Sequence, residues 1–328
     1  MPTEDPRRRP RVGVIGSYAK ALVMTADRIP VAGETLVGRH YRQTFGGKGS
    51  DMAVQAARLG ASVVFVGVVG DDAFGEEFAA LMRDEGVDVS HLRVSDHLPT
   101  GVGFIVKDEQ GTNVIVVDMG ANQLLGRRDI DDARELLAGC DVVLAQLEIP
   151  VDTAQYGLAV AKQGGARTIL NPAPGADLRS HDLSSVDVLT PNQTEARLLL
   201  GLSPNDRRDD AGIAETLLVQ VASAVVITRG GEGASLFERP DAGVGGAARM
   251  TAIGAFQVEV VDSNGAGDSF NAGLAVALAE GKGLADAAMF ASAVAGLCCE
   301  HWETVPSYQT RATVDAFLEV AGSARPGA

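Results

Sequence analysis

The ten residues from Val261 to Phe270 read V-D-S-N-G-A-G-D-S-F and combine carboxylates with a run of small side chains. An extended, β-branched segment, Phe256 to Val261, precedes the run, and Ala-rich, helix-forming sequence from about Asn271 to Ala279 follows it. Small residues at a helix start let backbone N–H groups converge, and the helix dipole adds partial positive charge there. The run therefore predicts a cradle for an anion. Its small residues are Gly265, Ala266 and Gly267.

The cradle is followed directly by a carboxylate, Asp268. A carboxylate would repel a bound phosphate, but it is well chosen to take the proton of an alcohol that attacks phosphorus. We therefore predict that Asp268 is the general base of a phosphoryl transfer. On this run alone a second interpretation is equally open, because the helix dipole stabilises an acidic residue in the first turn of any helix.

A second glycine-rich run, Phe45 to Asp51, precedes a helix that we expect to end near Leu59. It is not a P-loop, because that motif needs glycine at position 42, where Arg42 stands, and a serine or threonine at position 49. Its paired glycines still let a ligand approach the backbone closely, and Lys48 and Asp51 could bind hydroxyl groups. A plain glycine-rich turn is the alternative.

Polar residues also follow several expected strands, at the edge of a parallel sheet where ligands collect. Glu148 ends one strand and could contact a substrate. Asn192 and Glu195 follow another and could hold phosphate and a water-shelled Mg²⁺, an ion that needs few protein carboxylates. The same spacing fits a helix capping box. The turn from Thr228 to Gly233 could bind a ligand or simply connect a hairpin.

Short apolar, β-branched runs alternate with helical patterns along most of the chain, which predicts an α/β sandwich with a mainly parallel sheet. The expected strands are Val12–Gly16, Val63–Val69, Val142–Leu147, Thr168–Asn171, Val186–Thr190 and Ala224–Thr228. The expected helices are Gly49–Leu59, Phe74–Glu85, Ile130–Leu137, Thr153–Gln163, Gln193–Leu200 and Ile213–Val221.

Two segments break this alternation, at about residues 22–45 and 101–120. The second contains two alternating runs, Val102 to Lys107 and Asn113 to Asp118, joined by Asp108 to Gly111, which predicts a hairpin. Strands that leave the main sheet near its ligand edge would form a small β lid. Such a lid would exclude water from a transferable phosphoryl group.

The chain has 328 residues, three cysteines and a formal net charge of −15. The charge argues against binding to nucleic acid or anionic membranes. No apolar stretch approaches the ~20 residues that span a bilayer, so we expect a cytoplasmic protein. The cysteines fit neither a disulfide framework nor a zinc site. We expect one α/β domain at residues 11–320, with disordered tails at 1–10 and 322–328.

Taken together, these motifs resemble the ribokinase branch of the PfkB carbohydrate-kinase family, in order and over nearly the whole chain. The resemblance implies a three-layer α/β/α sandwich with a β lid, and transfer of the γ-phosphoryl group of ATP to a sugar hydroxyl. The matching segments are Gly16-Ser17, Pro30 to Glu34, Gly46 to Gly49, Gly67 to Gly75, Thr100 to Val102, Gly120 to Asn122, Gln146 to Glu148, Asn171 to Pro174, Thr190 to Glu195, Thr228 to Gly233 and Asp262 to Phe270.

The resemblance also implies roles for individual residues, with Asp268 as the base and residues 265–267 as the anion hole. The residues that would bind the sugar are Gly47, Lys48, Asp51 and Glu148. Those that would contact the nucleotide or its Mg²⁺ are Asn192, Glu195, Thr228, Gly230 and Gly233. Those that would hold a monovalent cation, K⁺, are Asp262, Ser263 through its carbonyl, and Ser307. Relatives that pair their lids imply a homodimer.

The chain departs from the family pattern in the presumed sugar pocket. Where ribokinases read G-S-x-N-x-D, Ala19 and Ala21 replace the two polar residues, and Asp51 replaces an asparagine. The loop Trp302-Glu303-Thr304 also stands where a glycine is usual. Unpaired buried hydroxyls are costly, so we expect an altered sugar specificity. Two alternatives are a nucleoside kinase of the same family and a catalytically silent sugar sensor. A Rossmann dehydrogenase is the least favoured alternative, because no G-x-G-x-x-G follows the first strand.

Overall fold

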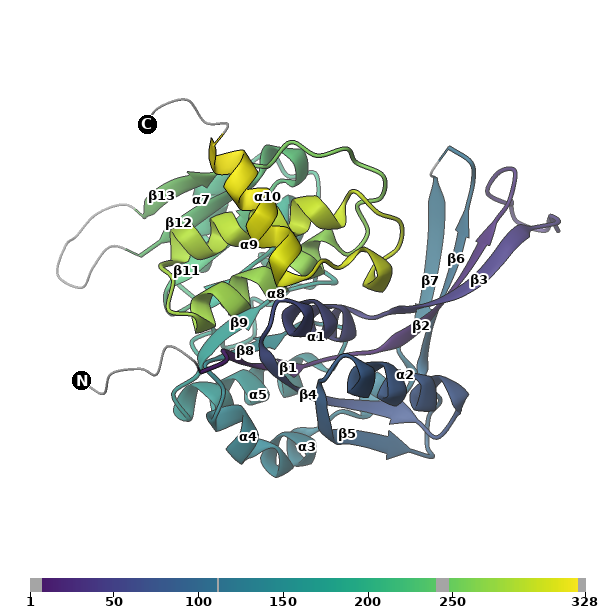
Figure 1. Ribbon diagram of the computed structural model, residues 1–328, viewed down its shortest axis with the longest axis horizontal. Coiled ribbons are helices and arrows are strands. Elements are labelled where there is room, and N and C mark those ends of the chain that lie inside the picture. The colour runs from purple at the N-terminus through teal and green to yellow at the C-terminus, as the bar shows by residue number, and fades with distance from the viewer. Residues whose placement is uncertain (1–7, 111, 240–247, 324–328) are drawn as a thin grey trace.

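A nine-stranded sheet forms the centre of the molecule in the computed structural model, which describes residues 8–110, 112–239 and 248–323 (Figure 1). Its strand pairs are parallel except those that β12 makes with its two neighbours. In spatial order the strands are β13 (Arg249–Ile253), β12 (Ala234–Glu238), β11 (Ala224–Thr228), β10 (Val188–Leu189), β9 (Arg167–Leu170), β8 (Val142–Ala145), β1 (Arg11–Ile15), β4 (Ser62–Gly70) and β5 (Asp88–Ser95).

Helices cover both faces of this sheet, so the predicted three-layer sandwich is confirmed (Figure 1). On one face lie α1 (Lys48–Arg58), α2 (Ala73–Asp84), α8 (Ala266–Ala279), α9 (Leu284–Cys298) and, packed on α9, α10 (Arg311–Ser323). On the other lie α3 (Arg127–Asp132), α4 (Arg134–Ala138), α5 (Val151–Gln163), α6 (Gln193–Leu199) and α7 (Asp210–Leu218). Short 3₁₀ turns occur at Gly120–Leu124, Gly230–Glu232 and Val305–Ser307.

The central strands are apolar on both sides because each side is covered by helices. Along β1, Val12 and Val14 pack toward α1 and α8, while Ile15 packs toward α5. Strand β4 alternates in the same way, with Phe65 on the first side and Val66 on the second. This is the pattern that buried parallel strands require, and it makes the sheet a rigid base for the loops at its carboxyl edge.

A separate four-stranded sheet, called the small sheet below, projects from one side of the sandwich (Figure 1). Its strands, in spatial order, are β3 (Arg39–Gly46), β2 (Ala19–Thr25), β6 (Gly101–Lys107) and β7 (Asn113–Asp118). The expected hairpin is present, since β6 and β7 pair antiparallel. Between β2 and β3, residues 26–38 form turns without strand pairing.

Several expected boundaries were wrong. Helix α8, by contrast, begins at Ala266, at the predicted helix start, so the helix already includes Asp268 and the residues before the Ala-rich stretch expected from about Asn271. Residues 256–261 belong to no strand, although the segment contains three valines and a phenylalanine. The helix expected at 130–137 is two short helices that meet at Ala133. Strands β5, β12 and β13 were not expected; β5 is half polar, and a short β-branched run does not distinguish an added edge strand from a loop.

The expected tails lie partly outside the described residues, which exclude 1–7 and 324–328. Residues 8–10 do contact the domain: Arg8 pairs with Asp141 at 3.0 Å, and the Pro10 carbonyl accepts from Ser62 N at 2.8 Å. Helix α10 extends to Ser323, beyond the expected domain end. In the described part of the chain, no helix is both long and apolar enough to cross a membrane.

Candidate active site

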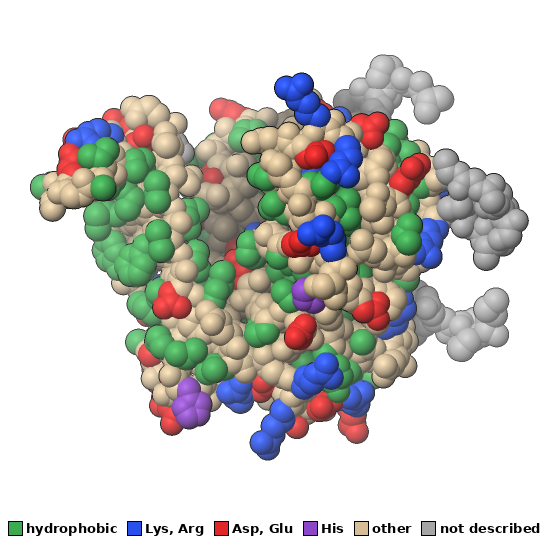
Figure 2. Space-filling view, turned by 180° about the vertical axis from the view of Figure 1, so that it is seen from behind, with side chains coloured by type: hydrophobic (Ala, Val, Ile, Leu, Met, Phe, Trp, Pro, Cys, Tyr) green, Lys and Arg blue, Asp and Glu red, His purple; other side chains and the backbone are tan. Residues whose placement is uncertain are grey.

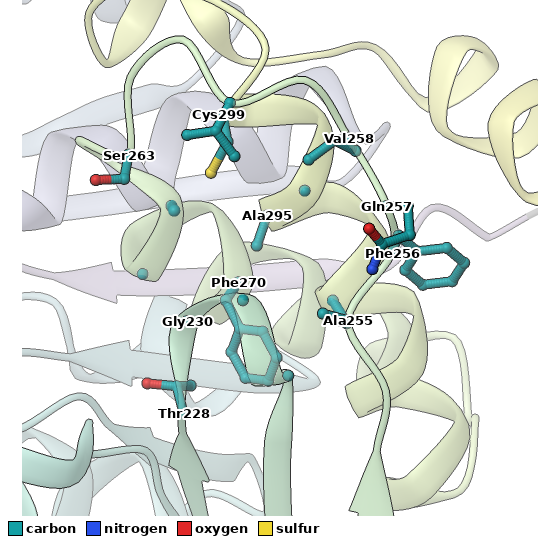
Figure 3. A pocket seen from close by; sticks show the side chains of 17 residues that line it. Thr228, Gly230, Ala255, Phe256, Gln257, Val258, Ser263, Phe270, Ala295 and Cys299 are labelled. Atoms are coloured by element: carbon teal, nitrogen blue, oxygen red, sulfur yellow. The ribbon is translucent and has the colours of Figure 1, made fainter.

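Two cavities open on either side of the N-terminus of α8. The larger, about 360 Å³, is lined by Ala266, Gly267 and Phe270 from this helix (Figure 3). The smaller, about 220 Å³, is lined by Gly265 and Asp268 from the same turn and by the inner side of the small sheet. The start of one helix therefore borders both spaces, and a group bound at that start is accessible to ligands in each of them.

The turn that begins α8 has the geometry of the predicted anion cradle. Gly265 is the helix N-cap with φ of 79°, a left-handed conformation that favours glycine. A Cβ at this position would also lie 2.8 Å from the Tyr308 hydroxyl. The first hydrogen bond of the helix ladder runs from Ser269 N to Gly265 O at 2.8 Å. The amides of residues 266–268 therefore precede the ladder, and that of Ala266 makes only a 3.3 Å bond to Ser263 O.

Asp268 is 7 % exposed, and its Oδ1 atom has no hydrogen-bond partner among the described residues. Burial raises the pKa of Asp268 to about 6, and the negative charges of Glu148 and Glu195 act in the same direction. The Lys48 ammonium, with Nζ 3.9 Å from Oδ1, opposes this rise. The result is a carboxylate that is ionised at neutral pH and basic enough to accept a proton.

Helix α1 presents Lys48 to the same cavity. Its N-cap, Gly47, has φ of 95°, and a Cβ there would lie 2.8 Å from both Ala19 N and Tyr18 Cα. Only glycine therefore lets the helix start pack so closely on β2. The Asp268 charge raises the pKa of Lys48, so the ammonium form is stabilised.

Glu148 follows β8 and is held at the start of α1. Its Oε2 atom accepts hydrogen bonds from Lys48 N at 2.8 Å and from the Ser17 hydroxyl at 2.6 Å. Ser17 in turn accepts from Gln146 Nε2 at 3.2 Å. These bonds fix the carboxylate, which lines the smaller cavity, as the strand-end position predicted.

Asp51 lies deeper in the smaller cavity, at 3 % exposure. Burial raises its pKa well above the ordinary range, and the nearby charges of Asp268 and Glu148 add to the shift. Its Oδ1 atom and the Tyr308 hydroxyl have no hydrogen-bond partner in the described part of the chain. Buried polar atoms are normally paired, so these are candidates for ligand contact.

The larger cavity brings together the glycine turn after β11 and the facing helices α8 and α9. Thr228, Gly230 and Gly233 line it, together with Phe270 and Cys299 (Figure 3). The segment that was expected to be extended, residues 256–261, forms another wall through Phe256, Gln257, Val258 and Val260. Small and apolar groups dominate this lining, which suits a flat aromatic ring.

Asn192 and Glu195 form the capping box that the sequence allowed. The Asn192 side chain accepts from Glu195 N at 2.8 Å, and the Glu195 carboxylate accepts from Asn192 N at 2.9 Å. Neither residue lines the two cavities. Asn192 does pair with Thr228 in a short parallel bridge, and Glu195 is close enough to raise the pKa of Asp268. Capping therefore accounts for the spacing, and it leaves both residues near the larger cavity.

The three residues assigned to a monovalent cation have different surroundings. Asp262 accepts hydrogen bonds from Asn264 N at 3.0 Å and Glu303 N at 3.2 Å. Ser307 is buried and donates to Thr304 O at 2.7 Å. Ser263 lines the larger cavity. Asp262 and Ser307 thus both hydrogen-bond to the loop at residues 302–304, Asp262 at Glu303 and Ser307 at Thr304.

That loop departs from the family pattern in residue type but retains a glycine-like backbone. Glu303 has φ of 72°, in the left-handed region where glycine is favoured. Its carboxylate pairs with Arg42 on β3 at 2.6 Å, and Lys107 on β6 lies over the Trp302 ring, 4.6 Å from the ring centre. Within the described ranges, no three His, Cys, Asp or Glu side chains are close enough to hold a metal ion.

Sequence reasoning missed residues that position the cradle. Asn271 donates to Gly267 O at 2.8 Å and accepts from the Thr190 hydroxyl at 2.6 Å, so it ties the first turn of α8 to the end of β10. Ser269 donates to Gln55 Oε1 at 3.1 Å, and both side chains are fully buried. A polar residue four positions beyond Gly267 in an Ala-rich helix was the available signal for Asn271.

A family model for the pfkB family carbohydrate kinases matches residues 9–311. The chain belongs to this family. It is 37 % identical to the ribokinase of Bacillus subtilis over 305 residues, covering 93 % of this chain and 98 % of that one. It is 33 % identical to the ribokinase of Haemophilus influenzae over 313 residues, covering 95 % of this chain and all of the other.

Solved structures agree with the family assignment. The Arabidopsis thaliana ribokinase complexed with ribose and ATP superposes with a TM-score of 0.86 at 29 % identity, covering 95 % of this chain and 99 % of that one. This protein is therefore a ribokinase-like PfkB carbohydrate kinase, as the ordered motifs predicted. A silent sensor has no support in the site, because the carboxylate and the glycine turn at the start of α8 are both intact.

Proposed function

We propose that this kinase transfers the γ-phosphoryl group of ATP from the larger cavity to an alcohol in the smaller one, with Asp268 as the base. The observation that carries the proposal is the position of the α8 N-terminus between the two cavities. Ala266 and Gly267 face the nucleotide side, and Asp268 faces the acceptor side. The β11 turn with Thr228, Gly230 and Gly233 supports the nucleotide, and Asn192 lies beside it.

In the proposed reaction, Asp268 takes the proton of the acceptor hydroxyl as its oxygen attacks the γ-phosphorus. The bond between the γ-phosphorus and the bridging oxygen breaks, and ADP leaves. Amides at the start of α8 stabilise the charge on the transferring group. Lys48, 3.9 Å from Asp268, keeps the base ionised, and with Gly47, Asp51 and Glu148 it binds the acceptor.

Mg²⁺ and K⁺ belong to the same proposal. Burial raises the pKa of Glu195, so a nearby cation would favour its ionised form, and ATP-bound Mg²⁺ needs only one such contact through water. When bound, Mg²⁺ would supply positive charge that offsets the negative charge of the phosphates. Asp262, the Ser263 carbonyl and the loop held by Ser307 are the groups that would hold K⁺. The Asp262 carboxylate retains acceptor capacity, and the Ser307 hydroxyl, which donates its proton to Thr304 O, keeps lone pairs on its oxygen.

Replacing the base tests the proposal. Asp268→Asn should lower kcat by about 10³-fold, the scale of general-base catalysis, in an ADP-release assay over pentoses, hexoses and polyols. ATP binding, measured by calorimetry, should persist. The matched control is Asp286→Asn, which changes the exposed first-turn acid of α9 and should leave kcat unchanged. Turnover by Asp268→Asn at the wild-type rate would show that another group is the base.

We further propose that the small sheet is the lid of a domain at residues 11–320 and that two copies pair through its outer face. That face exposes Met24, Tyr41, Phe104, Val114 and Val116 at 40–64 %. Hydrophobic side chains gather on the projecting lobe in Figure 2. Light scattering should give a dimer mass, and Phe104→Asp should give a monomer. The cytoplasm, where ATP is supplied, is the proposed location, and cell fractionation would test it.

A further inference from the structure

The side of the small sheet that faces the acceptor cavity is apolar across its two central strands. Strand register places Ala19, Ala21 and Val23 of β2 on one side of the sheet, beside Gly103 and Ile105 of β6. All of them line the cavity. No side chain in this group can form a hydrogen bond, so a ligand beneath these strands meets only hydrocarbon or backbone.

The neighbouring strand β7 extends the same surface. Ile115 pairs with Ile105, and Val117 with Gly103, so both lie on the cavity side. They are 49 % and 41 % exposed, respectively. Large apolar side chains exposed inside a concave site are a common mark of ligand contact. Polar side chains occur only at the margins of this surface, with Thr44 and Arg42 on edge strand β3 and Lys107 and Asn113 at its far end.

The opposite wall of the cavity is polar. Asp51 and Asp268, 3 % and 7 % exposed, each have an Oδ1 atom without a hydrogen-bond partner in the described chain. Lys48 lies beside Asp268, and Glu148 also lines the cavity, as do the polar residues Asp262, Asn264, Glu303 and Thr304. An acceptor in this space therefore has hydrogen-bonding groups on one side of it and an apolar surface on the other.

We infer that the acceptor is a deoxy sugar or deoxy polyol. It keeps the hydroxyl that is phosphorylated, but it has hydrogen or methyl in place of a hydroxyl on the side facing β2 and β6. This inference rests on the proposed kinase function and names the substrate class of its acceptor site. The hydroxyls of the acceptor face Asp51, Lys48, Glu148 and the base, and its C–H groups face Ala21, Val23 and Ile105. A fully hydroxylated sugar would leave at least one hydroxyl unpaired against these strands, which lowers its kcat/KM.

Matched pairs of acceptors test the inference with the wild-type enzyme. Pentoses, hexoses and alditols are each assayed beside their mono-deoxy and methyl-branched analogues that keep the primary hydroxyl. At least one analogue should exceed its parent about 10- to 100-fold in kcat/KM, the effect of one unpaired polar group. A preference for the parent in every pair, or for nucleosides over all free sugars, would overturn the inference while leaving the kinase proposal intact. Inactivity toward every alcohol would sink the kinase proposal, and this inference with it.

Substitutions on β2 then reverse the preference. Ala21→Asp should lower the analogue-to-parent ratio of kcat/KM at least tenfold, and the near-isosteric Val23→Thr should lower it in the same direction even if the first variant folds poorly. Gln43→Glu is the control, because Gln43 pairs with Leu22 on the outer side of the sheet and is exposed and polar. The Gln43 variant should leave the ratio unchanged. An unchanged ratio in both Ala21→Asp and Val23→Thr would mean that the acceptor does not contact this surface.

Discussion

The two cavities beside α8 are lined by different kinds of residue. The larger is lined mainly by glycines and by small or apolar side chains. They come from the turn after β11, such as Gly230, and from helices α8 and α9, such as Ala295. The smaller is lined by charged residues from one side and by strands of the small sheet from the other. In the proposed function, the larger cavity recognises the nucleotide through its backbone and its shape. The smaller cavity selects the acceptor through its side chains. Changes on the two sides should therefore have separable effects.

The largest effect should come where the cavities meet. Gly265→Val places a branched side chain at φ of 79° and next to the Tyr308 hydroxyl, so the start of α8 must shift. We expect kcat to fall about 100- to 1,000-fold in steady-state assays with either substrate varied. Gly281→Val is the control, because Gly281 also has a positive φ of 82° but no neighbour within 4 Å of its Cβ position. Equal losses in both variants would contradict a special role for the cradle.

The ionised carboxylate of Asp268, the proposed base, should lower the free energy of unfolding. The folded protein raises the pKa of Asp268 from its ordinary 3.8 to about 6, so this group's stabilising contribution is complete below pH 3.8 and is lost as the pH rises through about 6. At pH 8 the loss is about 3 kcal/mol, at 1.36 kcal/mol per pKa unit. Asp268→Asn should therefore unfold at higher denaturant concentration than wild type at pH 8. The difference should shrink toward pH 4; a constant difference would contradict this origin.

A smaller effect is expected at Lys48. Lys48→Met removes the charge that holds down the pKa of Asp268, so the acid limb of kcat/KM, near pH 6 in the wild type, should move to higher pH. We expect about a tenfold loss at neutral pH, with partial recovery at higher pH, and an unchanged KM for ATP. A pH profile that falls without shifting would mean that Lys48 acts only in binding the acceptor.

The smallest effect should be confined to the nucleotide side. Ala295→Leu places a larger side chain in the larger cavity, which Ala295 lines from α9 (Figure 3). KM for ATP should rise about tenfold, and KM for the acceptor should stay constant. Val320→Leu, on the exposed surface of α10, is the control and should change neither constant. An equal rise in both KM values would show that the two cavities are not independent.

The sequence predicted the sandwich, and it pointed to most residues of the candidate site, because the relevant signals are local. The run at 261–270 contains the proposed base and the proposed cradle together, and Gly47 lies beside Lys48. The pattern indicated a helix start at residues 265–267 but could not fix its first helical residue, Ala266, since small residues are compatible with either a turn or a helix. Residues such as Asn271 and Tyr308 depend on pairings that are distant in sequence. The wall at 256–261 shows the same limit, because its β-branched residues line a cavity without forming a strand.

The buried contact between Ser269 and Gln55 joins α8 directly to α1, and Gln55 also donates to Gln309 O at 3.0 Å. The helix that carries the proposed base and the helix that presents Lys48 are therefore bonded to each other through buried side chains. The small sheet contacts α1 at Gly47, but its cavity-facing side chains on β2, β6 and β7 take no part in these bonds. If the proposed acceptor site is correct, substitutions of these side chains should change which alcohol is accepted while the bonds between α1 and α8 stay in place, so new specificities could evolve by single steps.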